Sequence, residues 1–442
     1  MSTVVSNGII VTGNENGEII DNGTIIVNDT RITKIDSGKP HPLTASDEFI
    51  DASGCVIIPG FVQTHVHLCQ TLFRGMADDL QLLEWLQQRI FPFEAAHNEC
   101  SMHASATIGI AELMRSGTTT ILDMGSIHHE EAIVRAIGDS GLRAFVGKAM
   151  MDVNDLLPKL KESTRDSLSS THSLARQFHN SFDWRIKYAV APRFVLSCSD
   201  RLMREAFEMI GDFDGMLFHT HASENKNEMS AVRQRCRMDN IEFLHHLGVL
   251  SEKSVLAHCI HVSEHEIGML ASSHSNIAHC PSSNLKLGSG IANVPELLSK
   301  GINVSLGADG APCNNNLNMF EEMRLASLLQ KPIHGPTAMP AKKVFEMATL
   351  AGARALGLEK EIGSLNVGKK ADLVILDVQR LWNPIQGDSI YSTIVYSANP
   401  ENVVSVMIDG RWVYRNKALT TIEEPAVFTN AKRELSLLLE RM

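Results

Sequence analysis

Between residues 60 and 309 the sequence alternates eight times between a short apolar segment and a longer amphipathic one. The short segments have the length of buried strands, and longer ones such as Cys100–Arg115 and Leu202–Gly211 have helical periodicity. Eight strands alternating with helices predict an α/β fold, a (β/α)8 TIM-type barrel. The predicted strands are Gly60–His67, Thr118–Asp123, Arg143–Met150, Ile186–Arg193, Met216–Ala222, Val255–Cys259, Asn276–Cys280 and Asn303–Asp309.

The two ends of the chain predict a second, smaller unit built from strands. Gly23–Asp36 has β-branched residues on both sides of Asn28-Asp29, and Val403–Asn416 places Asp409-Gly410 between two short apolar runs. Both patterns are typical of β-hairpins. We therefore expect both termini to form one small β-sandwich domain. The expected domains are residues 1–58 together with 364–442 for the sandwich, and 59–363 for the barrel.

Composition and charge narrow the classes of partner. The 442-residue chain has a formal net charge of −11, which does not favour nucleic acid or an anionic membrane surface. No stretch reaches the roughly 18 consecutive apolar residues of a membrane span, and the N-terminus lacks the features of a signal peptide. The eight cysteines form no CxxC pair and are expected to be reduced. We expect a cytoplasmic protein with a small-molecule substrate.

In a barrel of this kind the functional side chains lie at the carboxyl ends of the strands. Several predicted strands end in residues that bind metals or titrate. These are His65, His67, Asp123, Arg193, His221, His258, His279-Cys280 and Asp309. Their concentration at one end of the barrel predicts that the functional site lies there.

A metal site is the first interpretation of these strand ends. His65 and His67 are two residues apart on one strand, so both imidazoles face the same side. An isolated His-x-His pair is weak evidence, but His221, His258 and Asp309 end later strands. Three imidazoles and one carboxylate, with water in a remaining position, suit a borderline ion such as Zn²⁺.

Glu224 follows His221 by three residues and is the candidate proton carrier. Over the barrel mouth, its carboxylate can take a proton from a metal-bound water and pass it to a substrate nitrogen. A position at a helix N-terminus is a second, compatible interpretation. His219 is expected one layer deeper, as a packed or supporting histidine. The doublets His128-His129 and His245-His246 are expected to be solvated.

Longer stretches resemble the amidohydrolase superfamily, in particular its aminohydrolases of purines and related N-heterocycles. They extend over nearly the whole chain and, as a set, are specific for superfamily and fold. These stretches are Pro59–His67, Thr71–Leu86, His219–Glu224, Val255–Cys259, His279–Gly290, Leu306–Lys331 and Ile362–Asp377. The last resembles the return of the chain into the β-sandwich, in agreement with the small domain predicted above.

The resemblance implies a cofactor and roles for individual residues. It implies one Zn²⁺ per subunit, or Fe²⁺ as in some members, and a homo-oligomer, either dimer or tetramer. The implied ligands are His65, His67, His221 and Asp309. Glu224 would carry a proton from the attacking water to the ring nitrogen, while His258 and Asp309 would position that water. Asp309 or Glu224 would then protonate the amino group, which leaves as ammonia.

The same stretches carry features of two substrate classes. Taken together, the sequences of these stretches resemble deaminases of methylthioadenosine and S-adenosylhomocysteine. In those enzymes the residue that matches Glu94 holds the ribose hydroxyls. Gln70 and Arg193 instead resemble the residues with which guanine deaminases read the base. A salt bridge at the strand end is the other interpretation of Arg193. Trp85, in the Thr71–Leu86 stretch, is the fourth residue expected to bind substrate.

The sequence therefore predicts a metal-dependent hydrolytic deaminase of a purine ring, an enzyme that hydrolyses C–N bonds in cyclic amidines. The expected substrates are 5′-modified adenosines, namely methylthioadenosine, S-adenosylhomocysteine or 5′-deoxyadenosine. A deaminase of guanine, a related oxopurine or a pterin is the alternative. A triazine amino- or chlorohydrolase is a further alternative, and a barrel without catalytic activity is the third.

Overall fold

The structure is a computed structural model that describes residues 2–38, 44, 46–154, 157–379, 387 and 389–442. The chain divides into two compact units. The first unit comprises Met1–Gln63, Ala111–Thr120 and Asn318–Glu423; the second comprises Thr64–Ile110, Ile121–Leu317 and Glu424–Met442. The domain boundaries expected at residues 58/59 and 363/364 stay a prediction. No helix among the described residues is long and apolar enough to cross a membrane.

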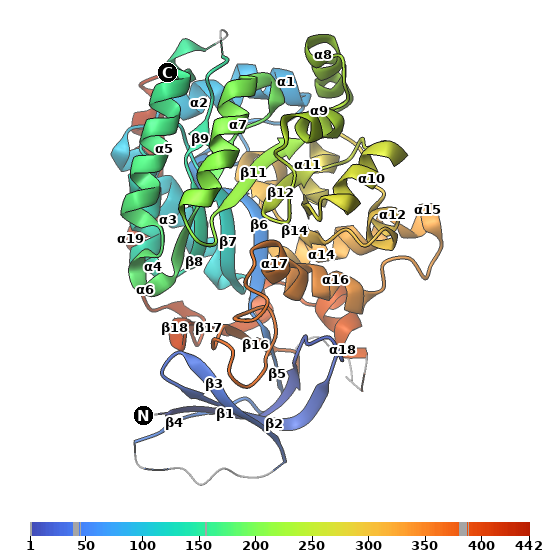
Figure 1. Cartoon of the computed structure of the whole chain (residues 1–442). Coiled ribbons are helices and arrows are strands. Elements are labelled where there is room, and N and C mark those ends of the chain that lie inside the picture. Colours follow the sequence, from blue (N-terminus) through green and yellow to red (C-terminus); the bar gives the residue numbers. More distant parts are fainter. Residues whose placement is uncertain (1, 39–43, 45, 155–156, 380–386, 388) are drawn as a thin grey trace. The chain divides into compact units, whose positions relative to one another are not determined.

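A parallel sheet with the order β14-β13-β12-β11-β10-β8-β7-β6-β15 forms the barrel (Figure 1). Its strands coincide with the eight predicted segments to within one or two residues at most ends, which confirms the predicted barrel. They are β6 (Phe61–His67), β7 (Thr118–Met124), β8 (Arg143–Gly147) with β9 (Ala149–Met150), β10 (Ile186–Pro192), β11 (Leu217–Ala222), β12 (Ser254–His258), β13 (Asn276–His279), β14 (Val304–Leu306) and β15 (Asp309–Gly310). Nearly every strand residue is buried, as expected of a parallel sheet covered by helices.

The eighth predicted strand is divided into two pieces, and this division closes the sheet. β14 pairs with β13, whereas β15 pairs with β6, with Asp309 opposite Val66. Gly307 lies between the two pieces, where an added Cβ would lie 2.6 Å from the backbone oxygen of His65. Only glycine permits so close an approach between the two strands. The carboxyl ends of the first and last strands therefore lie side by side.

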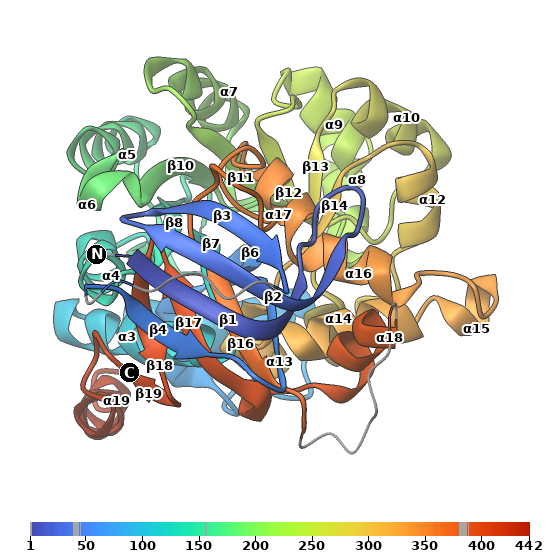
Figure 2. The ribbon, with the colours of Figure 1, turned by 90° about the horizontal axis from the view of Figure 1, so that it is seen from below.

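Helices of the second unit cover the barrel strands. Figure 2 shows α5, α7, α9, α10 and α12 arranged around the strands from β8 to β14. The bounds are η1 (Leu68–Phe73), α1 (Leu82–Trp85), the π-helix η2 (Leu86–Ile90), α2 (Phe91–Ala95), α3 (Glu99–Arg115), α4 (Glu130–Ser140), α5 (Thr164–Phe178), α6 (Ser181–Trp184), α7 (Asp200–Met209), α8 (Lys226–Cys236), α9 (Asn240–Leu247), α10 (Glu264–Ser272), α11 (Pro281–Lys286), α12 (Val294–Ser299) and α13 (Ala311–Asn314). α3 and α7 match the two helices predicted from periodicity.

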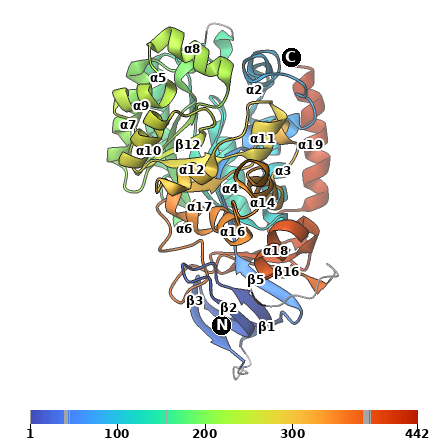
Figure 3. The same ribbon diagram turned by 90° about the vertical axis from the view of Figure 1, so that its right-hand side faces the viewer.

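The C-terminal helix α19 (Glu424–Leu439) also belongs to the second unit. Figure 3 shows it alongside α3 and near α2. Ala431 and Leu438 share an apolar cluster with Leu72, Phe73, Phe93 and Ala96. Beyond the helix, Arg441 donates to the backbone oxygen of Ala96 at 2.8 Å. The helix is therefore held by both burial and a hydrogen bond.

In the first unit, strands from both ends of the chain join in one sheet, ordered β19-β18-β17-β16-β5-β1-β2-β3 with β4 beside β1. Both predicted hairpins are present, with Asn28 opposite Arg31 and Ile408 opposite Arg411. This confirms the small β unit built by both termini. Its strands are β1 (Ser2–Val11), β2 (Ile19–Asn28), β3 (Arg31–Ser37), β4 (Glu48–Asp51), β5 (Cys55–Pro59), β16 (Leu373–Asp377), β17 (Val403–Ile408), β18 (Arg411–Arg415) and β19 (Ala418–Leu419). Its helices are α14 (Met319–Leu328), α15 (Lys331–His334), α16 (Ala341–Ala348), α17 (Leu350–Ala355) and α18 (Ser389–Ser392).

Candidate active site

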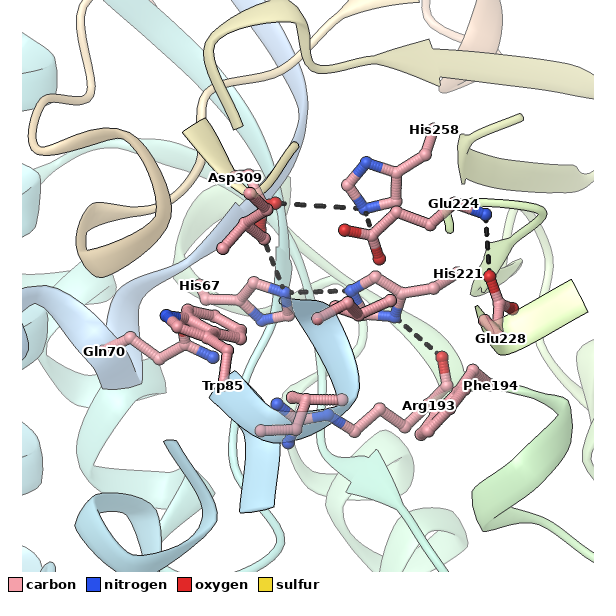
Figure 4. Close-up of a pocket in the computed structure, with 13 residues that line it drawn as sticks. His67, Gln70, Trp85, Arg193, Phe194, His221, Glu224, Glu228, His258 and Asp309 are labelled. Atoms are coloured by element: carbon pink, nitrogen blue, oxygen red, sulfur yellow. Dashed lines mark hydrogen bonds and ion pairs between the residues drawn. The ribbon is translucent and has the colours of Figure 1, made fainter. Parts of the chain in front are cut away.

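Four side chains, at the carboxyl ends of β6 and β11 and at the start of β15, converge on one point. Figure 4 shows three of them, His67, His221 and Asp309. Their ligand atoms all lie within 4.8 Å of one another, and the four residues are His65, His67, His221 and Asp309. The Nε2 atoms of His67 and His221 are 3.2 Å apart. Asp309 Oδ1 is 3.3 Å from the Nε2 of His65 and 3.4 Å from that of His67. The structure thus brings together the four ligands that the resemblance implies.

The rings of His67 and His221 are oriented by backbone carbonyl groups. The Nδ1 of His67 lies 2.7 Å from the oxygen of Met124, and the Nδ1 of His221 lies 2.7 Å from the oxygen of Arg193. Because a carbonyl oxygen only accepts, each Nδ1 carries the hydrogen and donates it. The Nε2 lone pairs therefore face the common point, which is the arrangement of a metal-binding histidine.

The ring of His65 is oriented by another histidine. His219 Nδ1 donates to the oxygen of Val255 at 2.8 Å, so its Nε2 accepts from the Nδ1 of His65, also at 2.8 Å. His219 is fully buried, in the deeper position expected from the sequence. The Nε2 of His65 is buried and has no hydrogen-bond partner among the described residues. A cation at the common point would satisfy this nitrogen, so the donor set fits a divalent metal ion.

The charge state of the four side chains suits a cation. Burial lowers the pKa of His65, His67 and His221, that of His67 to about 3, so the imidazoles are neutral near pH 7. Burial acts to raise the pKa of Asp309, but the polar contacts with His65, His258 and His67 outweigh it and hold this pKa well below its usual range. The four converging side chains therefore offer three neutral nitrogen donors and one negatively charged carboxylate.

Glu224 lies beside this group, buried among the residues that line the cavity. Its Oε2 is 3.5 Å from the Nε2 of His258, which is 3.8 Å from Asp309 Oδ2 (Figure 4). Burial first, and then the charge of Asp309, raises the pKa of Glu224 well above its usual range. The backbone N–H of Glu224 donates to Glu228 Oε2 at 2.7 Å, just before the N-cap Asn225 of α8. Glu224 therefore both lines the cavity and lies at the N-terminus of α8, so the two interpretations of its position hold together.

His258 and Asp309 have strained backbone conformations. Their φ angles are 73° and 61°, in the left-handed region that non-glycine residues seldom occupy. Each such residue costs roughly 1–3 kcal/mol and persists only where its surroundings hold it. Both residues are buried at strand ends. The fold therefore holds these two side chains at a cost in stability, as is typical of functional sites.

A cavity lies over the converging residues. It is lined by His67, Gln70, Leu82, Trp85, Leu86, Arg193, Phe194, His221, Glu224, Glu228, His258, Leu287 and Asp309. Three of the four residues expected to bind substrate, Gln70, Trp85 and Arg193, are among them. Glu94, the fourth, is not among the lining residues.

Glu94 is instead paired with Arg193. The guanidinium donates to Glu94 Oε2 at 2.7 Å and to Oε1 at 3.1 Å, and Gln70 Nε2 also donates to Oε1 at 2.9 Å. All three side chains are buried, and the Cζ of Arg193 lies 5.1 Å from the centroid of the Phe91 ring. The salt bridge considered for Arg193 is therefore present, with a carboxylate 99 positions earlier in the chain.

The remaining histidines and Asp123 lie outside the converging group. The doublets His128-His129 and His245-His246 are exposed, as expected. His279 is buried, and neither ring nitrogen has a hydrogen-bond partner among the described residues. Asp123 Oδ1 accepts from the backbone N–H of Leu68 at 2.8 Å, which supports the segment after β6.

Sequence reasoning missed three polar residues of the site. Ser283 and Asn284 contact Asp309 and His258, and Glu228 holds the backbone of Glu224. All three are buried. Ser283 and Asn284 lie in the resembling stretch after the seventh barrel strand, where two neighbouring polar residues in a buried segment were a usable signal.

Known proteins match this chain over most of its length. The sequence model of the Amidohydrolase family matches residues 56–413. A 5′-deoxyadenosine deaminase of Methanothermobacter thermautotrophicus is 40% identical over 97% of this chain and 98% of its own. A 5-methylthioadenosine/S-adenosylhomocysteine deaminase of Moorella thermoacetica is 35% identical over 95% and 96%. The crystal structure of an adenosine deaminase from Xanthomonas campestris with bound zinc is 28% identical, with a TM-score of 0.92 over 99% and 98% of the two chains.

Proposed function

Because the chain belongs to the amidohydrolase family, we propose that it is a hydrolytic deaminase of a purine ring that acts on 5′-modified adenosines. The observation that carries the proposal is the position of Glu224, a buried carboxyl group with a raised pKa beside the four converging side chains. A ring that gains a proton as water adds requires such a group. The names of the two relatives above support the choice of 5′-modified adenosines.

The proposal includes a metal cofactor. His65, His67, His221 and Asp309 would hold Zn²⁺, with Fe²⁺ as the alternative ion. When bound, the ion lowers the pKa of water and so supplies a nucleophile near neutral pH. The zinc of the Xanthomonas structure supports Zn²⁺.

The protein residues move the protons of the reaction. Glu224 takes a proton from the attacking water and delivers it to the ring nitrogen beside the attacked carbon. His258 Nε2, between Glu224 Oε2 and Asp309 Oδ2, holds the water in line with that carbon. As the carbon–nitrogen bond breaks, Asp309 or Glu224 transfers the second proton of the water, from the new hydroxyl group, to the amino group, which leaves as ammonia. The remaining oxygen becomes the carbonyl of the product.

Two buried polar atoms at the cavity support recognition of a heterocycle. Trp85 Nε1 and Gln70 Oε1 have no hydrogen-bond partner among the described residues, and both side chains line the cavity. One is a donor and the other an acceptor. A purine presents both kinds of group at its edge, and a substrate without them would leave these atoms unpaired at a cost in affinity.

A deaminase of guanine or a related oxopurine is the second candidate, and the ion pair of Glu94 favours it. The carboxylate of Glu94 is hydrogen-bonded to Arg193 and Gln70 and does not line the cavity. It is therefore not available to bind the ribose hydroxyls of a nucleoside. Arginine has five N–H donors, and Glu94 takes two of those of Arg193. The side chain lines the cavity, where a further N–H suits the carbonyl oxygen of a base.

Ammonia release from a substrate panel distinguishes the candidates. Zinc-loaded protein would be incubated with 5′-deoxyadenosine, methylthioadenosine, S-adenosylhomocysteine, guanine and 8-oxoguanine. Turnover of the adenosines supports the proposal, and turnover of guanine alone contradicts it. No ammonia from any of the five would exclude both purine candidates and direct the assay to amino- and chlorotriazines and pterins. The cytoplasmic location of the protein stays a prediction. Its assembly into a dimer or tetramer also stays a prediction, which light scattering tests.

A further inference from the structure

The short helix α11 begins directly after β13 and carries two neighbouring polar side chains into the site. Ser283 is 0% exposed and Asn284 is 1% exposed. Neither lines the cavity, so neither is placed to contact substrate. Each is hydrogen-bonded to a residue that does line it.

Ser283 determines which oxygen of Asp309 faces the histidines. Its hydroxyl donates to Asp309 Oδ2 at 2.6 Å. The other oxygen, Oδ1, accepts from the backbone N–H of Gly310 at 2.7 Å and lies 3.3 Å from the Nε2 of His65. With one hydrogen bond on each oxygen, rotation of the carboxylate is blocked and Oδ1 is presented to the metal position.

Asn284 determines which nitrogen of His258 faces the cavity. Its Oδ1 lies 2.9 Å from the Nδ1 of His258. An amide oxygen only accepts, so Nδ1 carries a hydrogen and donates it. Nε2 is then the ring nitrogen directed toward Glu224 and Asp309, and this atom has no hydrogen-bond partner among the described residues.

The helix is fixed to the segment that follows Asp309. Lys286, its last residue, donates to the backbone oxygen of Pro312 in α13 at 2.7 Å and pairs with Asp78 at 2.5 Å. The backbone oxygen of Asn284 accepts from the N–H of Ser289 at 2.9 Å. α11 therefore has little freedom to shift relative to the two residues that it supports.

We propose that Ser283 and Asn284 are positioning residues with separable effects, Ser283 on the metal ligand Asp309 and Asn284 on His258, which positions the attacking water. The inference rests on the proposed function. Loss of the Ser283 hydroxyl frees the carboxylate to rotate, which weakens metal binding. Loss of the Asn284 oxygen leaves the metal ligands untouched but releases the orientation of His258, which slows turnover.

Zinc affinity tests the first half without any substrate. Ser283→Ala is expected to weaken zinc binding by roughly 10- to 100-fold in competition with a chelator, the usual effect of removing a group that orients a ligand. Ser283→Thr keeps the hydroxyl and is expected to restore the affinity. Asn284→Ala is expected to bind zinc as the wild type does. Unchanged affinity in Ser283→Ala overturns this half.

Turnover of 5′-deoxyadenosine by zinc-saturated protein tests the second half. Asn284→Ala is expected to lower kcat by roughly 10- to 100-fold while KM changes by less than about threefold. Asn284→Asp keeps the accepting oxygen and is expected to recover at least part of kcat. Wild-type kcat in Asn284→Ala overturns this half.

Ser282→Ala is the matched control, because it removes a hydroxyl from a buried position of the same helix. It is expected to match the wild type in zinc affinity and kcat. Equal losses of zinc affinity and Tm in Ser283→Ala and Asn284→Ala would overturn the inference, since they would mean only that the helix is disrupted. A wild type inactive on all five compounds above contradicts the proposed function, whereas the zinc measurement still decides the role of Ser283.

Discussion

The Nδ1 of His65 donates to the Nε2 of His219 at 2.8 Å, so that one buried histidine orients another. His219→Phe keeps a buried aromatic ring but removes the acceptor, and the tautomer of His65 is then no longer determined. We expect zinc affinity to fall by roughly 10- to 100-fold. Chelator competition measures it, and His219→Gln, which offers an amide oxygen, is the control. Wild-type affinity in His219→Phe would contradict the role of this pair.

Glu224→Gln keeps the size of the side chain but removes its ability to exchange a proton. Because Glu224 is not one of the four converging residues, the variant is expected to retain metal. We expect kcat to fall by roughly 10²- to 10⁴-fold, the range of a general acid–base group. Elemental analysis and ammonia release measure the two quantities on one preparation. Full activity would remove Glu224 from the proton path.

The buried pair of Glu94 and Arg193 is expected to dominate the stability of the segment that it joins. Removal of one partner, as in Arg193→Met, leaves a buried charge and is expected to cost roughly 3–5 kcal/mol. The double variant Glu94→Leu, Arg193→Met removes both charges and is expected to recover much of that loss. Urea unfolding of the single and double variants measures it. Additive losses would show that the pair is not coupled.

Asp123 and Glu130 predict a pH dependence of stability. Burial raises the pKa of Asp123 to about 7 and that of Glu130, with help from the charge of Asp123, to about 8. Both lie above the ordinary values of roughly 4, so between about pH 4 and 8 the folded state binds more protons than the unfolded state. The free energy of unfolding therefore falls as the pH rises through this range.

Asp123→Asn tests this dependence, because the amide mimics the protonated acid and keeps an oxygen for the N–H of Leu68. We expect the variant to have a higher Tm than the wild type at pH 8 and a similar Tm at pH 5, with a flatter profile between them. Thermal unfolding at several pH values measures both. A parallel shift of the whole profile would contradict the assignment.

The barrel was predictable because its strands are continuous apolar runs that end in polar residues. His65, His67, His221, His258 and Asp309 could be selected because parallel strands bring their carboxyl ends together, whatever the loops between them do. Their roles in catalysis stay predictions. The division of the eighth strand around Gly307 was not predictable, since it results from the closure of the sheet.

Contacts between distant segments account for the other features of the site that could not be predicted from the sequence. The pairing of Arg193 with Glu94 depends on how residues 82–94 fold over the barrel, and no local pattern in either segment indicates it. Ser283 and Asn284 follow a predicted strand in a stretch that could draw attention to them, but the stretch alone does not indicate what they contact. Their partners, Asp309 and His258, become neighbours only when the strands are assembled.

Closure of the barrel by β15 has a consequence for how a metal ion would stabilise the chain. Two of the four converging side chains, His65 and His67, lie on the first strand, and Asp309 lies on the piece that pairs with it. A bound ion would cross-link residues 65 and 309 and so close a loop that contains nearly the whole barrel. Because the entropy that a cross-link removes from the unfolded chain grows with loop length, this cation would act on the unfolded state much as a long-range disulfide does.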